Sequence, residues 1–394
     1  VELGGTVGDI EGLILLESMR QLALEVGREN SIFIHLTYIP YISAAGEVKT
    51  KPTQQGVAKL REIGIMPDVL ICRTEVDLDA EHLEKLSLFC NVDRSCVIVE
   101  KDVEYSIYEI PLILSKAGLD EIILNRFQIE RPASSLDDWE DLLRVIRAPE
   151  GEVLIGMVGK YSELQDAYKS VDEALMHGGY AFGKKVIIEK IAAEDIERDP
   201  AILKKVDGIL IPGGFGSRGM EGKIMAAQYA REEKVPFLGI CLGLQCAVID
   251  FSRNICGLDG ADSTEFDGER EKKTKHPVVC LMEEQADVSE MGGTMRLGAY
   301  DCTLQAGSKV HVAYGQDKIS ERHRHRYEVN NSYRELLEKH GMLLSGLNPE
   351  IGVVEMIELV DHPWFVGTQA HPELKSQPIK PHPLFKGFIA ACAK

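Results

Sequence analysis

Apolar and polar positions in the first third of the chain form short blocks that predict helices and strands in turn. Apolar residues spaced three and four apart are typical of amphipathic helices, and short apolar runs between turn residues are typical of buried strands. In chain order the pattern predicts helix 13–26, strand 31–38, helix 53–63, strand 69–72, helix 80–90 and strand 96–100. Because helices alternate with strands, we expect a parallel sheet covered by helices.

The alternation lapses over residues 131–151 and then resumes. This segment is polar and contains proline, and one short amphipathic helix is predicted within it at 136–147. Such a composition is typical of an interdomain linker. The second alternation predicts strand 153–158, helix 163–178 and strand 185–191. Residues 265–300 follow no clear period, and we expect hairpins and a loop there.

The length of the chain agrees with this division, because 394 residues exceed what one ordinary hydrophobic core organises. We expect an α/β fold made of two doubly wound parallel-sheet domains. The predicted boundaries are a first domain at 1–130, a linker at 131–150 and a second domain at 151–394.

Composition narrows the class of protein. The hydrophobic fraction of 44% and the charged fraction of 27% are those of a globular protein. No apolar run approaches the roughly 20 residues of a membrane span, and we expect no export signal. The nine cysteines include no C-x-x-C pair, which favours a reducing compartment over disulfides or a zinc site. A net charge of −19 disfavours nucleic acid polymers and anionic membranes as partners, so we expect a cytoplasmic enzyme.

The most informative chemistry stands at Cys241, where an apolar strand from Val235 ends and a helix is expected to begin. Gly239 and Gly243 lie two residues either side, and a nucleophile on a sharp strand-to-helix turn needs such small neighbours. The helix N-terminus favours the thiolate and offers free N–H groups. Cys241 is therefore a candidate nucleophile, although a free cysteine is most often only a small buried apolar residue.

A candidate base and a candidate acid stand near the other end of the chain. A second apolar strand, at 364–368, is followed by His371 and Glu373. In extended chain, residues two apart point to the same side, so Glu373 is expected behind the imidazole while His371 faces the thiol. This is the arrangement of nucleophile, base and orienting acid.

A third segment, at 209–216, is an apolar strand that ends in a proline and two glycines. The N–H of Gly214 in this turn, together with that of Leu242, is expected to hold a developing oxyanion. Residues 214–219 also fit the dinucleotide-binding pattern G-x-G-x-x-G. We consider that alternative weaker, because the pattern is short and Pro212 beside it is unusual.

Two cations precede a predicted helix in the first domain. Lys49 and Lys51 flank a threonine, and Pro52, Thr53 and Gln54 open the helix. Two positive charges beside a helix N-terminus suit a triphosphate in an otherwise acidic protein. The simpler interpretation is a solvated loop. A second basic run, at 322–326, has the charge of a nucleic-acid patch but lacks interleaved aromatic residues, so we give that interpretation little weight.

Together, the segments around Cys241, His371 and the glycine turn resemble class I glutamine amidotransferases, with Glu373 completing the triad. Further motifs resemble the CTP synthase family over essentially the whole chain. They stand at residues 4–11, 49–54, 262–266, 292–298 and 322–330.

The resemblance implies a division of labour: one domain hydrolyses glutamine, and the other uses the ammonia and MgATP to convert UTP into CTP. It also implies GTP as an activator, CTP as a feedback inhibitor and a homotetramer assembled through the synthase domain. In the second domain it implies glutamine contacts at Gly214, Leu242, Gly243, Leu244, Gln245, Glu265 and Arg326.

In the first domain the resemblance implies UTP and CTP sites at Asp9, Ile10, Glu11, Lys49, Thr50, Lys51, Pro52, Thr53, Gln54 and Lys85. It further implies ATP contacts at Lys101, Asp102 and Val103, and a magnesium ligand at Glu2. Members of this family carry a glycine-rich phosphate loop upstream of these motifs, and the sequence contains no such loop. We therefore expect the ATP phosphate cradle and one magnesium-binding aspartate to lie outside this sequence.

Two other classes of protein stay open at this stage. One is a stand-alone cysteine hydrolase on the same fold, which has no use for the segment at 49–54. The other is a regulatory or filament-forming paralogue without synthase chemistry, which the complete triad disfavours. A fragment with glutaminase activity alone is the remaining alternative.

Overall fold

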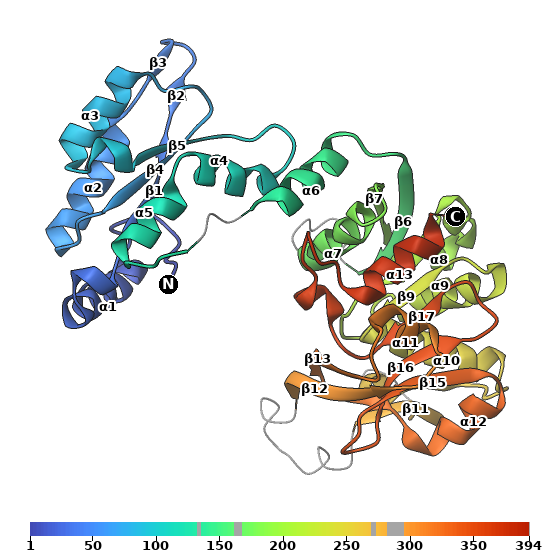
Figure 1. Cartoon of the computed structure of the whole chain (residues 1–394). Coiled ribbons are helices and arrows are strands. Elements are labelled where there is room, and N and C mark those ends of the chain that lie inside the picture. The colour runs from blue at the N-terminus through green and yellow to red at the C-terminus, as the bar shows by residue number, and fades with distance from the viewer. Residues whose placement is uncertain (132–134, 161–167, 269–272, 282–294, 394) are drawn as a thin grey trace. The chain divides into compact units, whose positions relative to one another are not determined.

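The computed structural model divides the chain into two compact units, Val1–Arg147 and Ala148–Lys394 (Figure 1). Part of the predicted helix 163–178 and part of the motif 292–298 lie outside the described residues. The structure describes residues 1–131, 135–160, 168–268, 273–281 and 295–393.

The first unit is built on a three-stranded parallel sheet, as the alternation predicts. Its spatial order is β1 (Ile34–Ile39), β4 (Val69–Thr74), β5 (Val97–Lys101). Val69, Leu70 and Cys72 are buried in the central strand, which explains its unbroken apolar run. The crossover helices are α2 (Lys51–Ile63) and α3 (Ala80–Cys90). Asp79 caps α3 by accepting a hydrogen bond from the His82 amide at 2.8 Å.

The remaining helices and strands of this unit lie outside the sheet. They are α1 (Ile10–Val26), the hairpin β2 (Tyr41–Ile42) and β3 (Glu47–Val48), α4 (Ile110–Lys116), α5 (Leu119–Arg126) and α6 (Asp137–Arg147). Helix α6 occupies most of the stretch predicted as a linker, and Trp139 on it packs on Tyr108 with ring centroids 5.8 Å apart. Helices α4 and α5 were not predicted.

The second unit contains a nine-stranded mixed sheet. Its parallel half, in spatial order, comprises β17 (Phe365–Thr368), β9 (Phe237–Ile240), β8 (Gly208–Ile211), β6 (Glu152–Gly159) and β7 (Lys185–Ala192). Alternate residues of β8 face opposite sides of the sheet: Ile209 and Ile211 pack into one core cluster and Leu210 into the other. The parallel half is therefore covered on both faces, which is the doubly wound arrangement.

The other half of this sheet is antiparallel, which the sequence pattern did not predict. Its strands are β13 (Lys318–His325), β12 (Arg296–Leu304), β15 (Met342–Leu347) and β16 (Val354–Leu359), the last of which pairs with β17. A separate small sheet contains β10 (Ala261–Ser263), β11 (His276–Leu281) and β14 (Tyr327–Val329). In β13, buried and exposed residues alternate strictly, and the buried side chains are those of Ile319, Glu321, His323 and His325.

Helices cover the two faces of the second sheet in separate groups. Residues of α8 (Ala193–Arg198), α9 (Met220–Glu233), α10 (Leu242–Asn254) and α12 (Arg334–Lys339) join one core cluster. Residues of α7 (Lys169–Tyr180), α11 (Lys309–Tyr314) and α13 (Pro383–Cys392) join the other. Among the residues that the structure describes, no helix is long and apolar enough to cross a membrane.

Candidate active site

Three segments that are far apart in the sequence meet at one edge of the second sheet. Strands β8, β9 and β17 are parallel neighbours, so their carboxyl ends lie at the same edge. Ile240 at the end of β9 is in register with Thr368 at the end of β17, and the Cys241 amide donates to the Thr368 carbonyl at 2.7 Å. The residues that follow these strands are therefore brought together by the sheet itself.

Cys241 stands on the turn between β9 and α10 in a strained backbone conformation. Its φ of 51° and ψ of −101° lie outside the regions that residues with side chains favour. The glycines beside it are required by close packing. A Cβ on Gly239 would lie 2.6 Å from the carbonyl carbon of Gly243, and one on Gly243 would lie 2.2 Å from the carbonyl oxygen of Ile211. The turn matches the nucleophile elbow expected from the sequence.

His371 and Glu373 form the expected pair, but by a different local geometry. Nδ1 of His371 lies 2.7 Å from Oε1 of Glu373. The extended chain expected here was wrong, because Pro372–Lys375 form a 3₁₀ turn that brings the carboxylate back to the imidazole. Burial lowers the pKa of His371, but hydrogen bonds with Cys241 and Glu373 outweigh it and raise that pKa to about 10. The imidazole is therefore held in its charged form beside the thiol.

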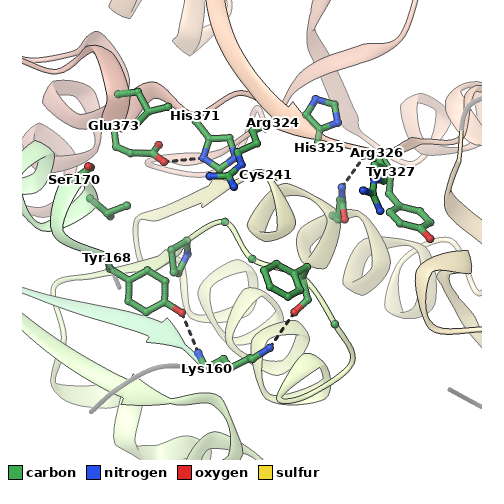
Figure 2. Close-up of a pocket in the computed structure, with 18 of the residues that line it drawn as sticks. Lys160, Tyr168, Ser170, Cys241, Arg324, His325, Arg326, Tyr327, His371 and Glu373 are labelled. Atoms are coloured by element: carbon green, nitrogen blue, oxygen red, sulfur yellow. Dashed lines mark hydrogen bonds and ion pairs between the residues drawn. The ribbon is translucent and has the colours of Figure 1, made fainter. Parts of the chain in front are cut away.

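These groups open onto one cavity of about 950 Å³ (Figure 2). Cys241, His371 and Glu373 line it together with Gly213 and Gly214 of the glycine turn. The loop that carries these glycines connects β8 to α9, and it forms a wall of the same cavity as the thiol. This placement favours the oxyanion interpretation of the turn over the dinucleotide one.

The cavity also contains an acid and a base suited to an amino acid. Glu265, Arg326 and Gln245 all line it. Oε1 of Glu265 accepts a hydrogen bond from the Gly216 amide at 2.9 Å, which ties the carboxylate to the glycine turn. Leu242, Gly243 and Leu244 are buried at the start of α10 and are not among the lining residues, so only their backbone groups remain candidates for ligand contacts.

Several lining residues were not singled out from the sequence as site residues. They are Lys160, Tyr168, Lys169, Ser170, Phe215, Lys223, Met295, Arg324, His325 and Tyr327, with Val171, Pro212, Gly216 and Leu374. The strict alternation of β13 was the available signal for some of them, because period two separates the buried His323 and His325 from the exposed Arg322 and Arg324. Lys223 is buried on α9, and burial lowers its pKa.

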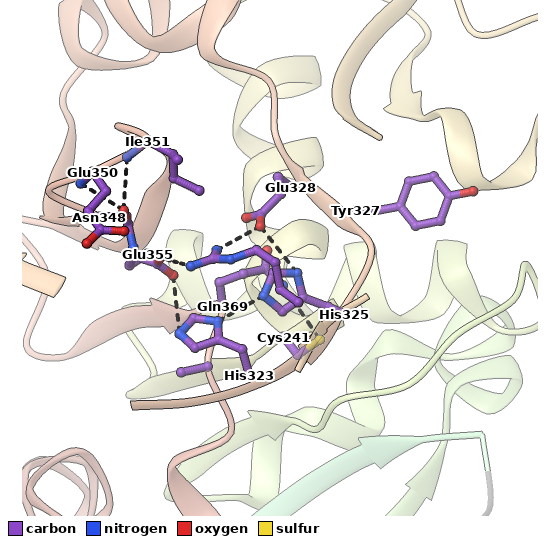
Figure 3. A network of polar contacts seen from close by, with 12 residues as sticks. Cys241, His323, His325, Tyr327, Glu328, Asn348, Glu350, Ile351, Glu355 and Gln369 are labelled. Carbon is purple, nitrogen blue, oxygen red and sulfur yellow. Dashed lines mark hydrogen bonds and ion pairs between the residues drawn. The ribbon is translucent and has the colours of Figure 1, made fainter. Parts of the chain in front are cut away.

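A buried polar network stands behind the nucleophile (Figure 3). Arg296 on β12 donates to Glu328 at 2.8 Å and to Glu355 at 2.7 Å. His323 and His325 are 2.9 Å apart, and each lies 3.5 Å from one of these carboxylates. Burial raises the pKa of Glu328 to about 8 and lowers that of His323 to about 3. The network therefore favours neutral imidazoles and a proton on one glutamate, beside a single positive charge.

The predicted triphosphate anchor lies at the start of α2. Thr50, Thr53 and Gln54 are buried: Thr53 Oγ1 lies 2.8 Å from Oγ1 of Thr37, and Gln54 donates to Thr50 at 3.2 Å. These side chains fasten the helix start to β1, whereas Lys51 and Pro52 are exposed. Lys49 pairs with Glu47 on the preceding strand.

The other predicted nucleotide residues are mostly exposed and come from several parts of the first unit. Lys101 ends β5, and Asp102 and Val103 follow it. They lie at the sheet edge at which β1 ends, since Ile39, Thr74 and Lys101 are in register. Lys101 pairs with Asp77 at 2.8 Å and Asp102 with Arg73 at 2.7 Å. Asp9, Ile10 and Glu11 begin α1, Lys85 lies on α3 and Glu2 precedes α1, all of them exposed.

The described residues contain no group of three or more His, Cys, Asp or Glu side chains arranged to hold a metal ion. Glu2 is a single exposed carboxylate. Mg²⁺ is commonly held by one or two carboxylates together with substrate phosphates, so Glu2 fits only as one ligand of a nucleotide-bound ion.

Comparisons with known proteins identify the family of each unit. A family model described as "Glutamine amidotransferase class-I" matches residues 163–391, and one described as "CTP synthase N-terminus" matches residues 1–129. The chain resembles the solved structure "Trypanosoma brucei CTPS - glutaminase domain with bound acivicin" at 37% identity and a TM-score of 0.57. That match covers 61% of this chain and 94% of the other.

Two curated relatives extend the similarity to almost the whole chain. The CTP synthase of Fibrobacter succinogenes is 54% identical over 392 residues, which is 99% of this chain and 69% of the relative. The CTP synthase of Caldanaerobacter subterraneus is 53% identical over 99% of this chain and 72% of the relative.

The elbow cysteine, the His–Glu pair and the mixed sheet define the second unit as a class I glutamine amidotransferase domain. The first unit is the one that matches the family model described as "CTP synthase N-terminus". The chain belongs to the CTP synthase family. Its activity is glutamine-dependent, ATP-dependent synthesis of CTP from UTP, a ligase reaction of pyrimidine nucleotide biosynthesis.

Proposed function

We propose that Cys241, His371 and Glu373 hydrolyse the glutamine that supplies nitrogen for CTP. The observation that carries the proposal is their convergence on one cavity that also holds a carboxylate, Glu265, and a guanidinium, Arg326. A free amino acid presents an ammonium and a carboxylate, and these two side chains suit that pair of charges. The convergence of five groups is hard to explain by packing alone.

In the proposed reaction the thiolate of Cys241 attacks the carbonyl carbon of the glutamine side-chain amide. The N–H groups of Gly214 and Leu242 stabilise the oxyanion. His371 donates its proton to the amide nitrogen, and the C–N bond breaks. Ammonia departs, and the glutamyl group stays bound to the sulfur of Cys241 as a thioester. Water then attacks the thioester carbonyl while His371 accepts a proton from the water. Glutamate is released, and Cys241 returns to its thiolate form. Glu373 holds the imidazole in place throughout.

The proposed binding mode orients glutamine with its side chain toward the sulfur. Glu265 binds the α-ammonium and Arg326 the α-carboxylate, while Gln245 and the backbone of Leu242, Gly243 and Leu244 surround the reacting amide. Support comes from the positions of Glu265, Arg326 and Gln245 on the cavity wall.

For the first unit we propose that UTP binds at the start of α2, with Lys49 and Lys51 as its cationic contacts and Lys85 nearby. Residues 50 and 52–54 complete this anchor through the helix N-terminus. The segment Asp9–Glu11, with Ile10 between them, is proposed to contact inhibitory CTP. Lys101, Asp102 and Val103 are proposed to bind ATP, because the carboxyl edge of a parallel sheet is the usual ligand edge.

Further parts of the proposal concern cofactors and assembly. Mg²⁺ is proposed to accompany ATP with Glu2 as one ligand, and bound there it would neutralise phosphate charge. We also propose activation by GTP, a homotetramer formed through the synthase unit, and a cytoplasmic location. The nine free cysteines support a reducing compartment.

The test is CTP formation from UTP and MgATP by the complete enzyme, with glutamine or with ammonia as nitrogen donor. In Cys241→Ala we expect glutamate release and glutamine-dependent synthesis to be lost and ammonia-dependent synthesis to persist. Cys246→Ala is the matched control, because this thiol is fully buried on α10, is not among the residues that line the cavity, and has its pKa raised by burial to about 12. Loss of both activities in Cys241→Ala would contradict the division of labour, and glutamate release without CTP formation by the unaltered chain would favour a glutaminase alone.

A further inference from the structure

Gln369 is a buried polar residue in direct contact with the nucleophile. It follows β17, and its side chain is fully buried. Its Nε2 lies 3.6 Å from Sγ of Cys241, within hydrogen-bonding distance for sulfur. The backbone N–H of Gln369 donates to the backbone carbonyl of Glu355 at 2.8 Å, which fixes this part of the chain to β16. Figure 3 shows the side chain beside Cys241, on the side of the buried network.

The orientation of the Gln369 amide is determined by a chain of hydrogen bonds that starts at a backbone carbonyl. The Tyr327 carbonyl lies 3.0 Å from the side-chain nitrogen of Gln245, and a carbonyl can only accept. Gln245 must therefore present its NH₂ group there. The same NH₂ group lies 3.3 Å from Oε1 of Gln369, which accepts its second hydrogen. The NH₂ group of Gln369 is then left to face the sulfur, so Gln369 is a donor and not an acceptor.

We propose that Gln369 is a further catalytic residue, whose amide N–H holds the sulfur of Cys241 in its ionised form and in position for attack. The inference rests on the proposed role of Cys241 as nucleophile. An N–H donor aimed at sulfur favours the thiolate over the thiol, because hydrogen bonds to charged groups are the stronger ones. His371 lines the cavity, whereas Gln369 reaches the sulfur from its fully buried position.

The same donor acts when the thioester breaks. Water adds to the glutamyl carbonyl carbon, the C–S bond breaks and the electron pair of that bond returns to sulfur. His371 has accepted the proton of the water, and the N–H of Gln369 stabilises the departing thiolate. Because Gln245 lines the cavity and also holds Gln369, a single hydrogen-bonded chain joins the proposed substrate site to the sulfur.

The test is the pH dependence of Cys241 alkylation by iodoacetamide, followed by peptide mass spectrometry, together with glutaminase kinetics. Gln369→Met keeps the length and bulk of the side chain without the donor. We expect its alkylation midpoint to rise by about one to two pH units, and kcat/KM for glutamine to fall about 10- to 100-fold. In Gln369→Glu a carboxylate replaces the donor, and we expect a larger rise than in Gln369→Met.

Ser345→Ala is the control for a polar-to-apolar change in the same sheet, because Ser345 is fully buried on β15 and its hydroxyl has no hydrogen-bond partner among the described residues. We expect its alkylation profile and kinetics to match those of the unaltered chain. An unchanged alkylation midpoint in folded Gln369→Met overturns the proposal, even if kcat falls. Should Gln369→Met fail to fold, Gln369→Asn withdraws the amide by one methylene and must show the same rise in midpoint.

The outcome also separates this inference from the proposed function. If Cys241→Ala retains glutaminase activity, the proposed role of Cys241 is wrong, and the proposed role of Gln369 is wrong as well. If Cys241→Ala is inactive and the alkylation midpoint of Gln369→Met is unchanged, the nucleophile stands and only the role of Gln369 is wrong.

Discussion

Oε1 of Glu373 lies 2.7 Å from Nδ1 of His371, two residues away along a 3₁₀ turn. Both side chains are largely buried at the carboxyl edge of the sheet. The short contact fixes which imidazole nitrogen faces away from the cysteine, and therefore which nitrogen is available to exchange protons with it.

Glu373→Gln keeps the size of the side chain and removes its charge. We expect the pKa of His371 to fall from about 10, because the residue at position 373 would still accept a hydrogen bond from the imidazole but would no longer carry a negative charge. Glutaminase kcat should fall on the order of 10²- to 10⁴-fold, as when the orienting acid of a triad is neutralised. Steady-state glutamate release over a range of pH measures both effects. The exposed Glu350→Gln serves as control, and equal losses in the two variants would argue against an orienting role.

Lys51→Ala tests the triphosphate anchor at the start of α2. Loss of one charge-assisted contact should raise the KM for UTP about 10-fold, with glutamine and with ammonia alike. CTP formation at varied UTP concentration measures this. Lys59→Ala, which removes an exposed lysine farther along the same helix, should leave the KM unchanged. An effect on glutamine hydrolysis alone would refute the placement of UTP at this helix.

Arg296→Met leaves the buried Glu328 and Glu355 without their shared cation. Breaking a buried ion pair from one side typically costs about 3–5 kcal/mol, so we expect a clear loss of stability in the second unit. Thermal unfolding followed by near-UV circular dichroism measures it. Arg198→Gln removes an exposed i,i+3 pair instead, and about 0–1 kcal/mol is expected there. Comparable losses in the two variants would mean that the buried network contributes no more than a surface pair.

The raised pKa of Glu328 makes stability depend on pH in a predictable direction. Between about 4.5 and about 8 the folded chain keeps this proton while the unfolded chain releases it, so stability falls as pH rises through that window. Glu328→Gln has no proton to lose. We therefore expect the melting temperature of Glu328→Gln, relative to the unaltered chain, to increase steadily from pH 4.5 to pH 8. A constant difference across that range would show that Glu328 titrates normally.

Local sequence patterns were sufficient to predict the strands and the tight turn that position much of the candidate site. The apolar runs before Cys241 and His371 predicted the strands β9 and β17, and the glycines beside the cysteine predicted a tight turn that the structure contains. These features depend on residues adjacent in the chain, where side-chain size and hydrophobic period act directly. The geometry between His371 and Glu373 was mispredicted, because proline at position 372 begins a 3₁₀ turn where extended chain was expected.

The sequence by itself determined the parallel alternation, the tight turn at Cys241 and the choice of candidate reactive groups, since each is a property of a short segment. Only the tertiary structure decided that the antiparallel strands β12, β13, β15 and β16 extend the sheet and place Arg296, His323 and Glu355 in the interior. It also decided that Gln369 faces the sulfur, through contacts with residues as much as 128 positions away. Such pairings arise from strand order and register, which no local period encodes.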